Sequence, residues 1–336
     1  MKAIQPTVEK YFNGICIDWC EFTVTPVLDD NITILEVMEL IGLGDVPVVE
    51  AYGQNGYKTA CEFDKIYFFA DGFKSGMGVH VRMSGQGCRN FEKHSTLSFK
   101  QLFELIYKSD NIKLTRLDVA YDDFEGLIDL EAVKQDVIDR NIVTRFKSYN
   151  VLLGFQVDHP EVSCTINFGR MASNIWITLY DKLEERKSKE IYPDCNHWVR
   201  CEIKMRRQNA NRFVQLLNEG KNLHELYFLV LNNYIRIVNP DQNDSNRWRW
   251  SVADHWAKFC NSVLSDRMSL YKAPDDPYTV DNLVRYVTQQ AGAAIYTYIK
   301  KFSINDLVEK VAPKQFRLAY KYQELLSDPE ELVDVE

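Results

Sequence analysis

Apolar and polar residues alternate in several short segments of the first two-thirds of the chain. Residues 175–180 read Ile-Trp-Ile-Thr-Leu-Tyr, so aliphatic side chains alternate with Trp, Thr and Tyr. A period of two is the pattern of a half-buried strand, in which successive side chains point to opposite faces. The pattern predicts that the aliphatic residues face the core. Tyr180 is then on the opposite face, at the end of the strand and two residues before Lys182.

The same period predicts further strands, whereas apolar residues spaced three and four apart predict helices. Strands are expected at 15–24, 113–122, 146–157, 162–169, 175–181 and 197–206, with short strands and glycine-rich turns between 48 and 84. The two glycines of residues 85–89, Gly-Gln-Gly-Cys-Arg, suit a tight turn. Helices are expected at 32–41, 96–108, 130–140, 210–219, 223–231, 252–264, 279–301, 304–311 and 313–326. The predicted fold is therefore α+β, with a strand-rich domain at 1–208 followed by a helical C-terminal region at 209–336.

Four of the predicted strands carry polar side chains on one face only. These side chains are Arg116, Asp118 and Asp122 on one strand, Arg200, Glu202, Lys204 and Arg206 on another, His80 and Arg82 on a third, and Tyr180 on the fourth. If helices cover the apolar face of the sheet, these side chains gather on its open face. Strand order is not written in the sequence, so their convergence is a hypothesis.

Such a face has the chemistry of phosphoryl transfer. Carboxylates, with or without a histidine, form an oxygen-rich site suited to Mg²⁺ or Mn²⁺, and the metal would polarise a phosphodiester oxygen. Arginines and lysines would hold the neighbouring phosphates. A tyrosine hydroxyl has a pKa of about 10, so it needs a metal or a cation such as Lys182 or Lys204 to attack phosphorus. Plainer interpretations stay open: a solvated face of an antiparallel sheet, an edge aromatic at Tyr180, and a surface residue at His80.

Composition narrows the class of protein. The 336 residues carry a formal net charge of −8 and contain no apolar run long enough for a membrane span or a signal peptide. Eight cysteines without C-x-x-C spacing argue against a zinc module and a disulfide framework, so a cytoplasmic protein is expected.

Proteins that coat nucleic acid are normally basic, so DNA binding here requires a local basic surface. One candidate is 200–212, which includes Arg207. The other, Arg-Trp-Arg-Trp at 247–250, is equally well interpreted as a helix edge packed on the sheet.

Several segments resemble the motifs of one family. Residues 77–89, Met-Gly-Val-His-Val-Arg-Met-Ser-Gly-Gln-Gly-Cys-Arg, resemble a Gly-Val-His-Val-Glu-Met-Ser-Gly-Gln-Gly-Cys-Arg segment of the Rep_trans-type replication initiation factors. These proteins initiate replication of rolling-circle plasmids and filamentous phages, and relatives nick integrative conjugative elements. Residues 116–123, 178–184, 199–206, 253–259 and 279–287 resemble further motifs of the family, in the same order along the chain.

The resemblance implies a relaxase-like nicking domain built on an antiparallel sheet with helices on one face. Tyr180 falls on the nucleophile of the family, and Asp118 and Glu202 fall on acidic positions assigned to a metal. Asp122 and His80 are further candidate ligands. Two departures from the family are the segment Phe-Gly-Arg-Met-Ala-Ser at 168–173 and Thr178, which replaces an arginine.

The leading hypothesis is a rolling-circle replication initiator that cleaves an extruded hairpin or single strand through Tyr180, with Mg²⁺ or Mn²⁺. Lys182 and Lys204 would assist, leaving a 5′-phosphotyrosine. Expected DNA contacts are Arg89, Arg116, Arg200, Arg206, Arg207, Arg247 and Arg249. The helical region would recognise the origin or form a homodimer, and a host helicase is a further expected partner. The alternatives are a relaxase for conjugative transfer and a non-catalytic DNA-binding regulator.

Overall fold

The computed structural model describes residues 14–27, 31–44, 46–156, 159–189, 191–260 and 280–312. The chain divides into two compact units, residues 1–271 and residues 272–336. Among the described residues, no helix combines the length and the apolar character needed to cross a bilayer.

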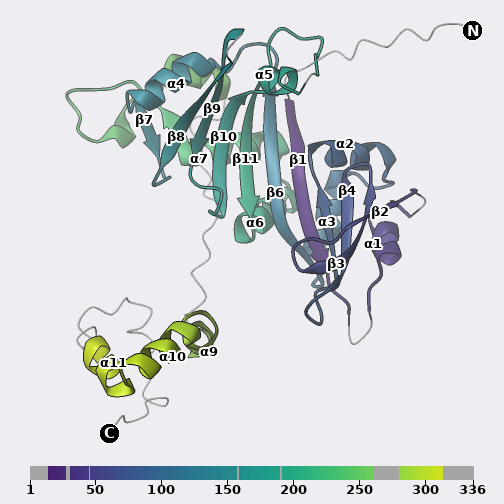
Figure 1. Ribbon diagram of the computed structural model, residues 1–336. Coiled ribbons are helices and arrows are strands. Elements are labelled where there is room, and N and C mark those ends of the chain that lie inside the picture. Colours follow the sequence, from purple (N-terminus) through teal and green to yellow (C-terminus); the bar gives the residue numbers. More distant parts are fainter. Residues whose placement is uncertain are drawn as a thin grey trace, which may run out of the picture. The chain divides into compact units, whose positions relative to one another are not determined.

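A ten-stranded antiparallel sheet forms the centre of the first unit (Figure 1). From one edge to the other its strands are β2 (Val49–Tyr52), β3 (Tyr57–Phe63), β4 (Ile66–Gly72), β5 (Val79–Met83), β1 (Gly14–Val24), β6 (Ile112–Asp123), β11 (Val199–Arg206), β10 (Ile175–Asp181), β9 (His159–Phe168) and β8 (Tyr149–Gln156). β7 (Ile142–Thr144) and β12 (Ile235–Ile237) form a small second sheet. The order places β1, β6, β11 and β10 side by side, although they are far apart in the sequence.

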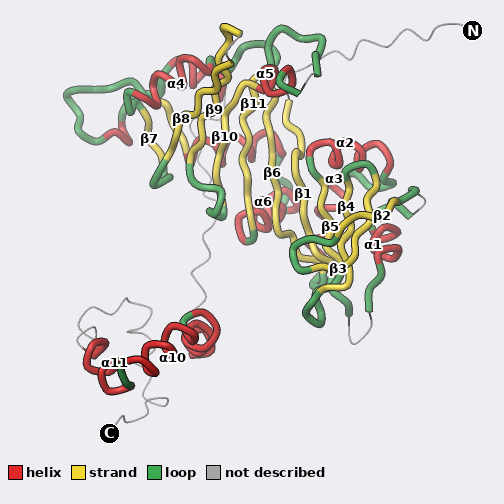
Figure 2. The backbone as a smooth tube through the Cα atoms, viewed as in Figure 1, coloured by secondary structure: helices red, strands yellow, loops and turns green. Residues whose placement is uncertain are grey.

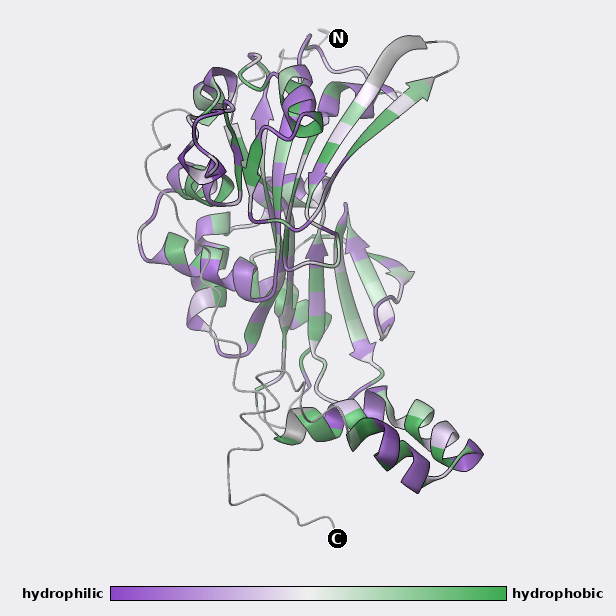
Figure 3. Ribbon diagram, turned by 90° about the vertical axis from the view of Figure 1, so that its left-hand side faces the viewer, coloured by the Kyte–Doolittle hydropathy of each residue, from purple (hydrophilic) through white to green (hydrophobic). Residues whose placement is uncertain are grey.

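Helices pack on one face of the large sheet (Figure 2). The helices of this unit are α1 (Ile34–Leu40), α2 (Gly85–His94), α3 (Phe99–Lys108), α4 (Leu130–Ile138), α5 (Lys182–Lys187), α6 (Gln208–Asn218), α7 (Leu223–Tyr234) and α8 (Asp254–Cys260), with a 3₁₀ turn at Arg247–Arg249. α2 packs on β1, β4 and β5, α3 on β6, and α6 on β6 and β11. Hydrophobic and hydrophilic residues alternate along the strands (Figure 3). The apolar side chains, such as Val119 and Ile203, belong to the main core. The expected α+β fold, an antiparallel sheet with helices on one face, is confirmed.

A β-bulge in β1 changes which of its residues face the core. Ile17 lies opposite Val119 and Trp19 lies opposite Asp118, so Asp18 is an extra residue without a direct partner on β6. A one-residue insertion reverses the alternation that follows it. Ile17 and Cys20 are both buried in the core although three positions separate them.

Gly85 to Arg89, expected to form a tight turn, instead begin α2. A Cβ atom at Gly87 would lie 2.2 Å from the backbone oxygen of Lys65. Glycine is therefore needed here because the helix approaches the backbone of the β3–β4 turn closely, and not because a turn requires it.

The structural division differs from the boundary expected after residue 208. α6 and α7 pack with the sheet of the first unit, and the buried hydroxyl of Tyr227 donates a hydrogen bond to the Cys201 oxygen at 2.7 Å. These helices complete the core beneath β6 and β11.

The second unit contains α9 (Val280–Arg285), a π-helical turn (Tyr286–Gln290), α10 (Gly292–Lys301) and α11 (Ile304–Val311). None of its described side chains is fully buried. The helix expected at 313–326 lies outside the described residues, as does residue 279 and the end of the helix expected at 252–264.

Candidate functional site

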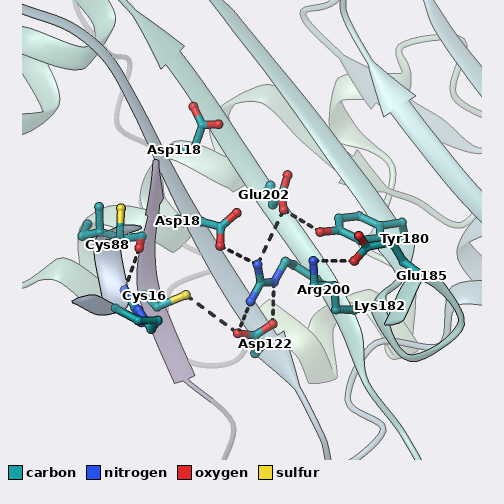
Figure 4. A network of polar contacts seen from close by, with 12 residues as sticks. Cys16, Asp18, Cys88, Asp118, Asp122, Tyr180, Lys182, Glu185, Arg200 and Glu202 are labelled. Carbon is teal, nitrogen blue, oxygen red and sulfur yellow. Dashed lines mark hydrogen bonds and ion pairs between the residues drawn. The ribbon is translucent and has the colours of Figure 1, made fainter. Parts of the chain in front are cut away.

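The polar faces of β6, β11 and β10 adjoin at the centre of the sheet (Figure 4). In the strand register Tyr180 lies opposite Arg200, and Arg200 lies opposite Asp122. Four residues away along the strands, Lys204 lies between Trp176 and Asp118. The structure therefore brings together the polar side chains that three separate strand patterns had placed on one face.

Tyr180 is held by a carboxylate on the neighbouring strand. Its Oη donates a hydrogen bond to Glu202 Oε1 at 2.7 Å. Burial raises the pKa of the Tyr180 phenol well above its ordinary value. The charge of Glu202 raises this pKa further, whereas Arg200 lowers it. The phenol is therefore protonated at neutral pH, and Glu202 is the base in contact with its proton.

The strand that carries Tyr180 ends immediately after it. Asp181 caps α5, because its Oδ1 accepts a hydrogen bond from the backbone N–H of Glu184 at 2.9 Å. Lys182 is the first residue of this helix, and its Nζ lies 5.4 Å from the centroid of the Tyr180 ring. Its ammonium group is already paired with Glu185 at 2.5 Å.

Lys204, the second expected catalytic cation, binds the other oxygen of the same glutamate. Its Nζ lies 2.7 Å from Glu202 Oε2. Glu202 is 5% exposed, so this contact forms in a largely desolvated place. Glu202 thus joins Tyr180 to Lys204, and the lysine lies one side chain away from the phenol.

Arg200 is the most heavily engaged cation of the site. Its Nε and Nη2 donate to the two oxygens of Asp122 at 2.6 and 2.7 Å, and its Nη1 donates to Asp18 at 2.6 Å. Trp198 Nε1 also donates to Asp122, at 2.6 Å. With all these donors on its oxygens, Asp122 acts in this structure as the anchor of a buried guanidinium.

Asp118 forms the corresponding pair at the other end of the site. Arg116 Nε and Nη2 donate to its two oxygens at 3.0 and 2.6 Å. Asp118 is 2% exposed, and burial raises the pKa of its carboxyl to about 6 although Arg116 acts in the opposite direction. The guanidinium of Arg116 also lies 4.1 Å from the ring centroid of Trp19.

The expected metal ligands have oxygens of the right chemistry for Mg²⁺ or Mn²⁺, but their arrangement does not fit a preformed site. Arg116, Lys204 and Arg200 occupy the oxygens of Asp118, Glu202 and Asp122 respectively. Across the described ranges, no group of three His, Cys, Asp or Glu side chains is placed to hold a metal ion.

His80 is separated from these carboxylates by β1. It lies opposite Thr23, its Nδ1 is 2.9 Å from Thr23 Oγ1, and its ring stacks on Tyr57 at 6.0 Å. Trp19, which lies opposite Asp118, is four residues from Thr23, or about 13 Å along the strand. Burial lowers the pKa of His80, which favours its neutral form.

The expected DNA contacts divide into two sets. Arg116, Arg200 and Arg206 lie on the polar face, where Arg206 Nη1 donates to the Met171 oxygen at 3.0 Å. Arg207 is exposed at the start of α6.

The other three arginines lie elsewhere. Arg89 belongs to α2 and donates to the Ile17 oxygen at 2.7 Å. Arg247 donates to the Arg140 oxygen at 3.1 Å, and Arg249 forms a bidentate pair with Asp244.

Thr178, which replaces an arginine of the family motif, is 5% exposed between Trp176 and Tyr180. Its Oγ1 donates to Asn167 Oδ1 at 3.0 Å. Thr178 therefore forms a neutral hydrogen bond to β9 where the family motif has an arginine, and it contributes no charge to the site.

The sequence interpretation missed Asp18, Trp19 and Trp198 as parts of the site. The only local signal for Asp18 is a carboxylate within an otherwise apolar strand segment, Ile-Cys-Ile-Asp-Trp-Cys at 15–20. The bulge that directs it to Arg200 depends on pairing with β6, which local periodicity does not reveal.

Comparisons with known proteins identify the family of the chain. The model of the family "Replication initiation factor" matches residues 112–310, and that of "Rolling Circle replication initiation protein N-terminal domain" matches residues 14–107. A Bacillus subtilis (strain 168) protein described as a candidate DNA relaxase, NicK, is 27% identical over 231 residues, which are 67% of this chain. The match spans 65% of the length of that relative.

A solved structure provides a further comparison. The rolling circle replication initiator protein from Geobacillus stearothermophilus superposes with a TM-score of 0.68 and 29% identity, over 77% of this chain and 99% of that one. The regions that the two family models match contain every strand of the large sheet and the Tyr180 site. The chain belongs to the replication initiation factor family of rolling-circle initiators and relaxases.

Proposed function

We propose that this protein initiates rolling-circle replication by nicking DNA through attack of Tyr180 on a phosphodiester. The observation that carries the proposal is the hydrogen bond from Tyr180 to Glu202, 2.7 Å long, beside Arg200 and Lys204. A phenol in contact with a base and next to cations has the arrangement required of an activated nucleophile.

The transfer is a single displacement at phosphorus. A bond forms between Tyr180 Oη and phosphorus while the bond between phosphorus and the 3′ oxygen breaks. Glu202 takes the phenolic proton, and the departing 3′ oxygen takes up one proton from solvent water to leave as a hydroxyl. The products are a 5′-phosphotyrosine and a free 3′ end, from which replication can be primed. Lys204 and Arg200 are the cations nearest to the charge that develops.

A divalent cation, Mg²⁺ or Mn²⁺, is part of the proposal as a cofactor. Asp18, Asp118, Asp122 and Glu202 oppose only Arg116, Arg200 and Lys204, so these seven side chains leave one negative charge when all are ionised. A phosphodiester would add another negative charge, and a divalent cation would offset both. Its entry requires that Lys204 or Arg116 release a carboxylate, so no step of the transfer is assigned to it.

Rolling-circle initiation is preferred because both the family and the solved structure from Geobacillus stearothermophilus are rolling-circle initiators. The DNA substrate of the proposal follows from that membership. Relaxase action on a conjugative element is the second candidate, favoured by the similarity to the Bacillus subtilis relaxase candidate. It uses the same residues and differs in the DNA site and in a coupling protein as partner.

The decisive experiment is a nicking assay on supercoiled plasmid that carries the cognate origin, with Mn²⁺ or with a chelator. The native protein is expected to form a covalent DNA adduct that Tyr180→Phe does not form. Tyr192→Phe, which alters a tyrosine that is 76% exposed, is the matched control and should nick normally. Adduct formation by Tyr180→Phe would refute the nucleophile, and full activity with the chelator would refute the metal. Origin binding without cleavage under any metal would instead identify a non-catalytic regulator.

A further inference from the structure

Three arginines on the polar face have their guanidiniums over aromatic rings. The guanidinium carbon of Arg82 lies 4.8 Å from the ring centroids of both Tyr67 and Phe69. That of Arg116 lies 4.1 Å from Trp19, and that of Arg206 lies 4.8 Å from Trp176. These contacts are spread over five adjacent strands, from β4 to β11, with Trp176 on β10 beyond them.

The strand register places most of these side chains in one line across the sheet. Tyr67 lies opposite Arg82, Arg82 opposite Glu21, Glu21 opposite Arg116, and Arg116 opposite Arg206. Strands about 4.8 Å apart make this line roughly 19 Å long. We call Tyr67, Arg82, Trp19, Arg116 and Arg206 the aromatic–arginine row.

The row lies on the same face as the nucleophile. Trp176 and Tyr180 are four residues apart on β10, which is about 13 Å along the strand. Arg206 is six residues from Arg200, the partner of Tyr180 in the register, and so lies about 20 Å from that position. A strand of DNA held by Tyr180 can therefore continue onto the row without leaving the sheet.

Two arginines of the row, Arg82 and Arg206, hydrogen-bond to neutral groups. Arg82 donates to Gln54 Oε1 at 3.1 Å and Arg206 donates to the Met171 oxygen at 3.0 Å. No carboxylate in the described part of the chain forms an ion pair with either, whereas Arg116, Arg200 and Lys204 are all paired. Glu21, opposite Arg82, accepts a hydrogen bond from Trp19 Nε1 at 2.9 Å.

Arg116 and Arg206 are also directly opposite each other in the register. Like charges in that position destabilise a sheet. A bound anion between them would offset the repulsion. In a chain with a net charge of −8, the guanidiniums of Arg82 and Arg206 on this face are places where a phosphate backbone can bind.

We propose that the aromatic–arginine row is a binding track for single-stranded DNA that leads to Tyr180. Arg82 and Arg206 hold phosphates, while the partly exposed rings of Trp19 and Tyr67 offer faces on which bases stack. Stacking on protein rings requires unpaired bases, so the track distinguishes a single strand from a duplex. The inference rests on the proposed function, because it assigns the DNA that the nucleophile would cleave.

The track is tested by binding in a protein that cannot cleave. In the full chain carrying Tyr180→Phe, fluorescence anisotropy is measured with a labelled single-stranded oligodeoxythymidine at several salt concentrations. Adding Arg82→Gln should weaken binding severalfold and reduce the slope of log K against log salt by about 0.7, the contribution of one phosphate on a single strand. Adding Tyr67→Leu should weaken binding about fivefold or more.

Lys100→Gln is the matched control, since it removes one positive charge from an exposed position of α3, on the helical side of the sheet. It should leave affinity and slope unchanged. Circular dichroism of each variant excludes loss of folding as the cause.

Equal affinity and slope for Arg82→Gln and Lys100→Gln would overturn the track, as would equally tight binding of a duplex of the same length. Neither result depends on cleavage, so failure of the track is distinguishable from failure of Tyr180 as nucleophile.

Discussion

Glu202 contacts both Tyr180 and Lys204. One of its oxygens accepts a hydrogen bond from Tyr180 Oη and the other binds Lys204 at 2.7 Å. Because burial and Glu202 both raise the pKa of the phenol, a standing phenolate is disfavoured. In the proposed mechanism, reactivity therefore depends on proton transfer to Glu202 during the attack, and Lys204 stabilises the carboxylate form that accepts the proton.

Asp122 has a different role from the one that the sequence indicated. It was expected among the metal ligands, but in the structure it anchors Arg200 and accepts from Trp198. Replacing one partner of a buried pair leaves the other charge without compensation, which is costly.

We expect Asp122→Ala to lower the free energy of unfolding by about 3–5 kcal/mol, because it removes two of the three hydrogen bonds from the buried guanidinium of Arg200 to carboxylates and leaves only the one to Asp18. Urea denaturation measures the change. Glu225→Ala breaks an exposed pair with Lys221 and should cost less than about 1 kcal/mol. Equal effects of the two substitutions would show that the Arg200 pair does not stabilise the fold.

At the scale of elements, local periodicity predicted the strands of the sheet and their buried faces. The segments expected at 15–24, 113–122, 175–181 and 197–206 became β1, β6, β10 and β11 with shifts of at most a few residues. In β6, β10 and β11 the apolar face follows the local alternation, whereas in β1 the bulge at Asp18 changes which residues face the core. α2 was missed because its two glycines were interpreted as turn residues.

The position of α2 provides a test of that correction. Gly87→Ala places a Cβ 2.2 Å from the backbone oxygen of Lys65, so the helix or the β3–β4 turn must move. We expect a loss of about 1–3 kcal/mol in the free energy of unfolding. Lys93→Ala, at an exposed position of the same helix, should change stability by less than about 0.5 kcal/mol. Equal stability of Gly87→Ala and Lys93→Ala would show that the helix does not approach the β3–β4 turn this closely.

At the scale of the whole molecule, the structure assigns the site and the main core to residues 1–271. The sequence had marked a boundary at 208, where strands give way to helices. Composition changes there, but α6 and α7 still cover the sheet.

Two truncated chains distinguish the structural boundary at residue 271 from the boundary at residue 208 that composition suggested. A chain of residues 1–271 should unfold cooperatively with a Tm within about 3 °C of the intact protein, as followed by circular dichroism. A chain of residues 1–208 lacks α6 and α7 and exposes the core beneath β11, so it should fail to fold. Cooperative folding of the shorter chain would restore the boundary that composition suggested.

The sequence by itself determined which segments are strands, which side of each is apolar, and that Tyr180 lies on the polar side. These are consequences of a two-residue period, which acts over a few neighbouring positions. Its ordered motifs also indicated the family.

Only the tertiary structure determined which side chains surround Tyr180. Pairing of β1, β6, β11 and β10 places Asp18 and Trp198 in the site, and β1 separates His80 from the carboxylates. It also brings a cationic side chain to the carboxylates of the site. Pairing between strands far apart in the sequence depends on hydrogen bonds and packing across the whole sheet, which no local pattern contains.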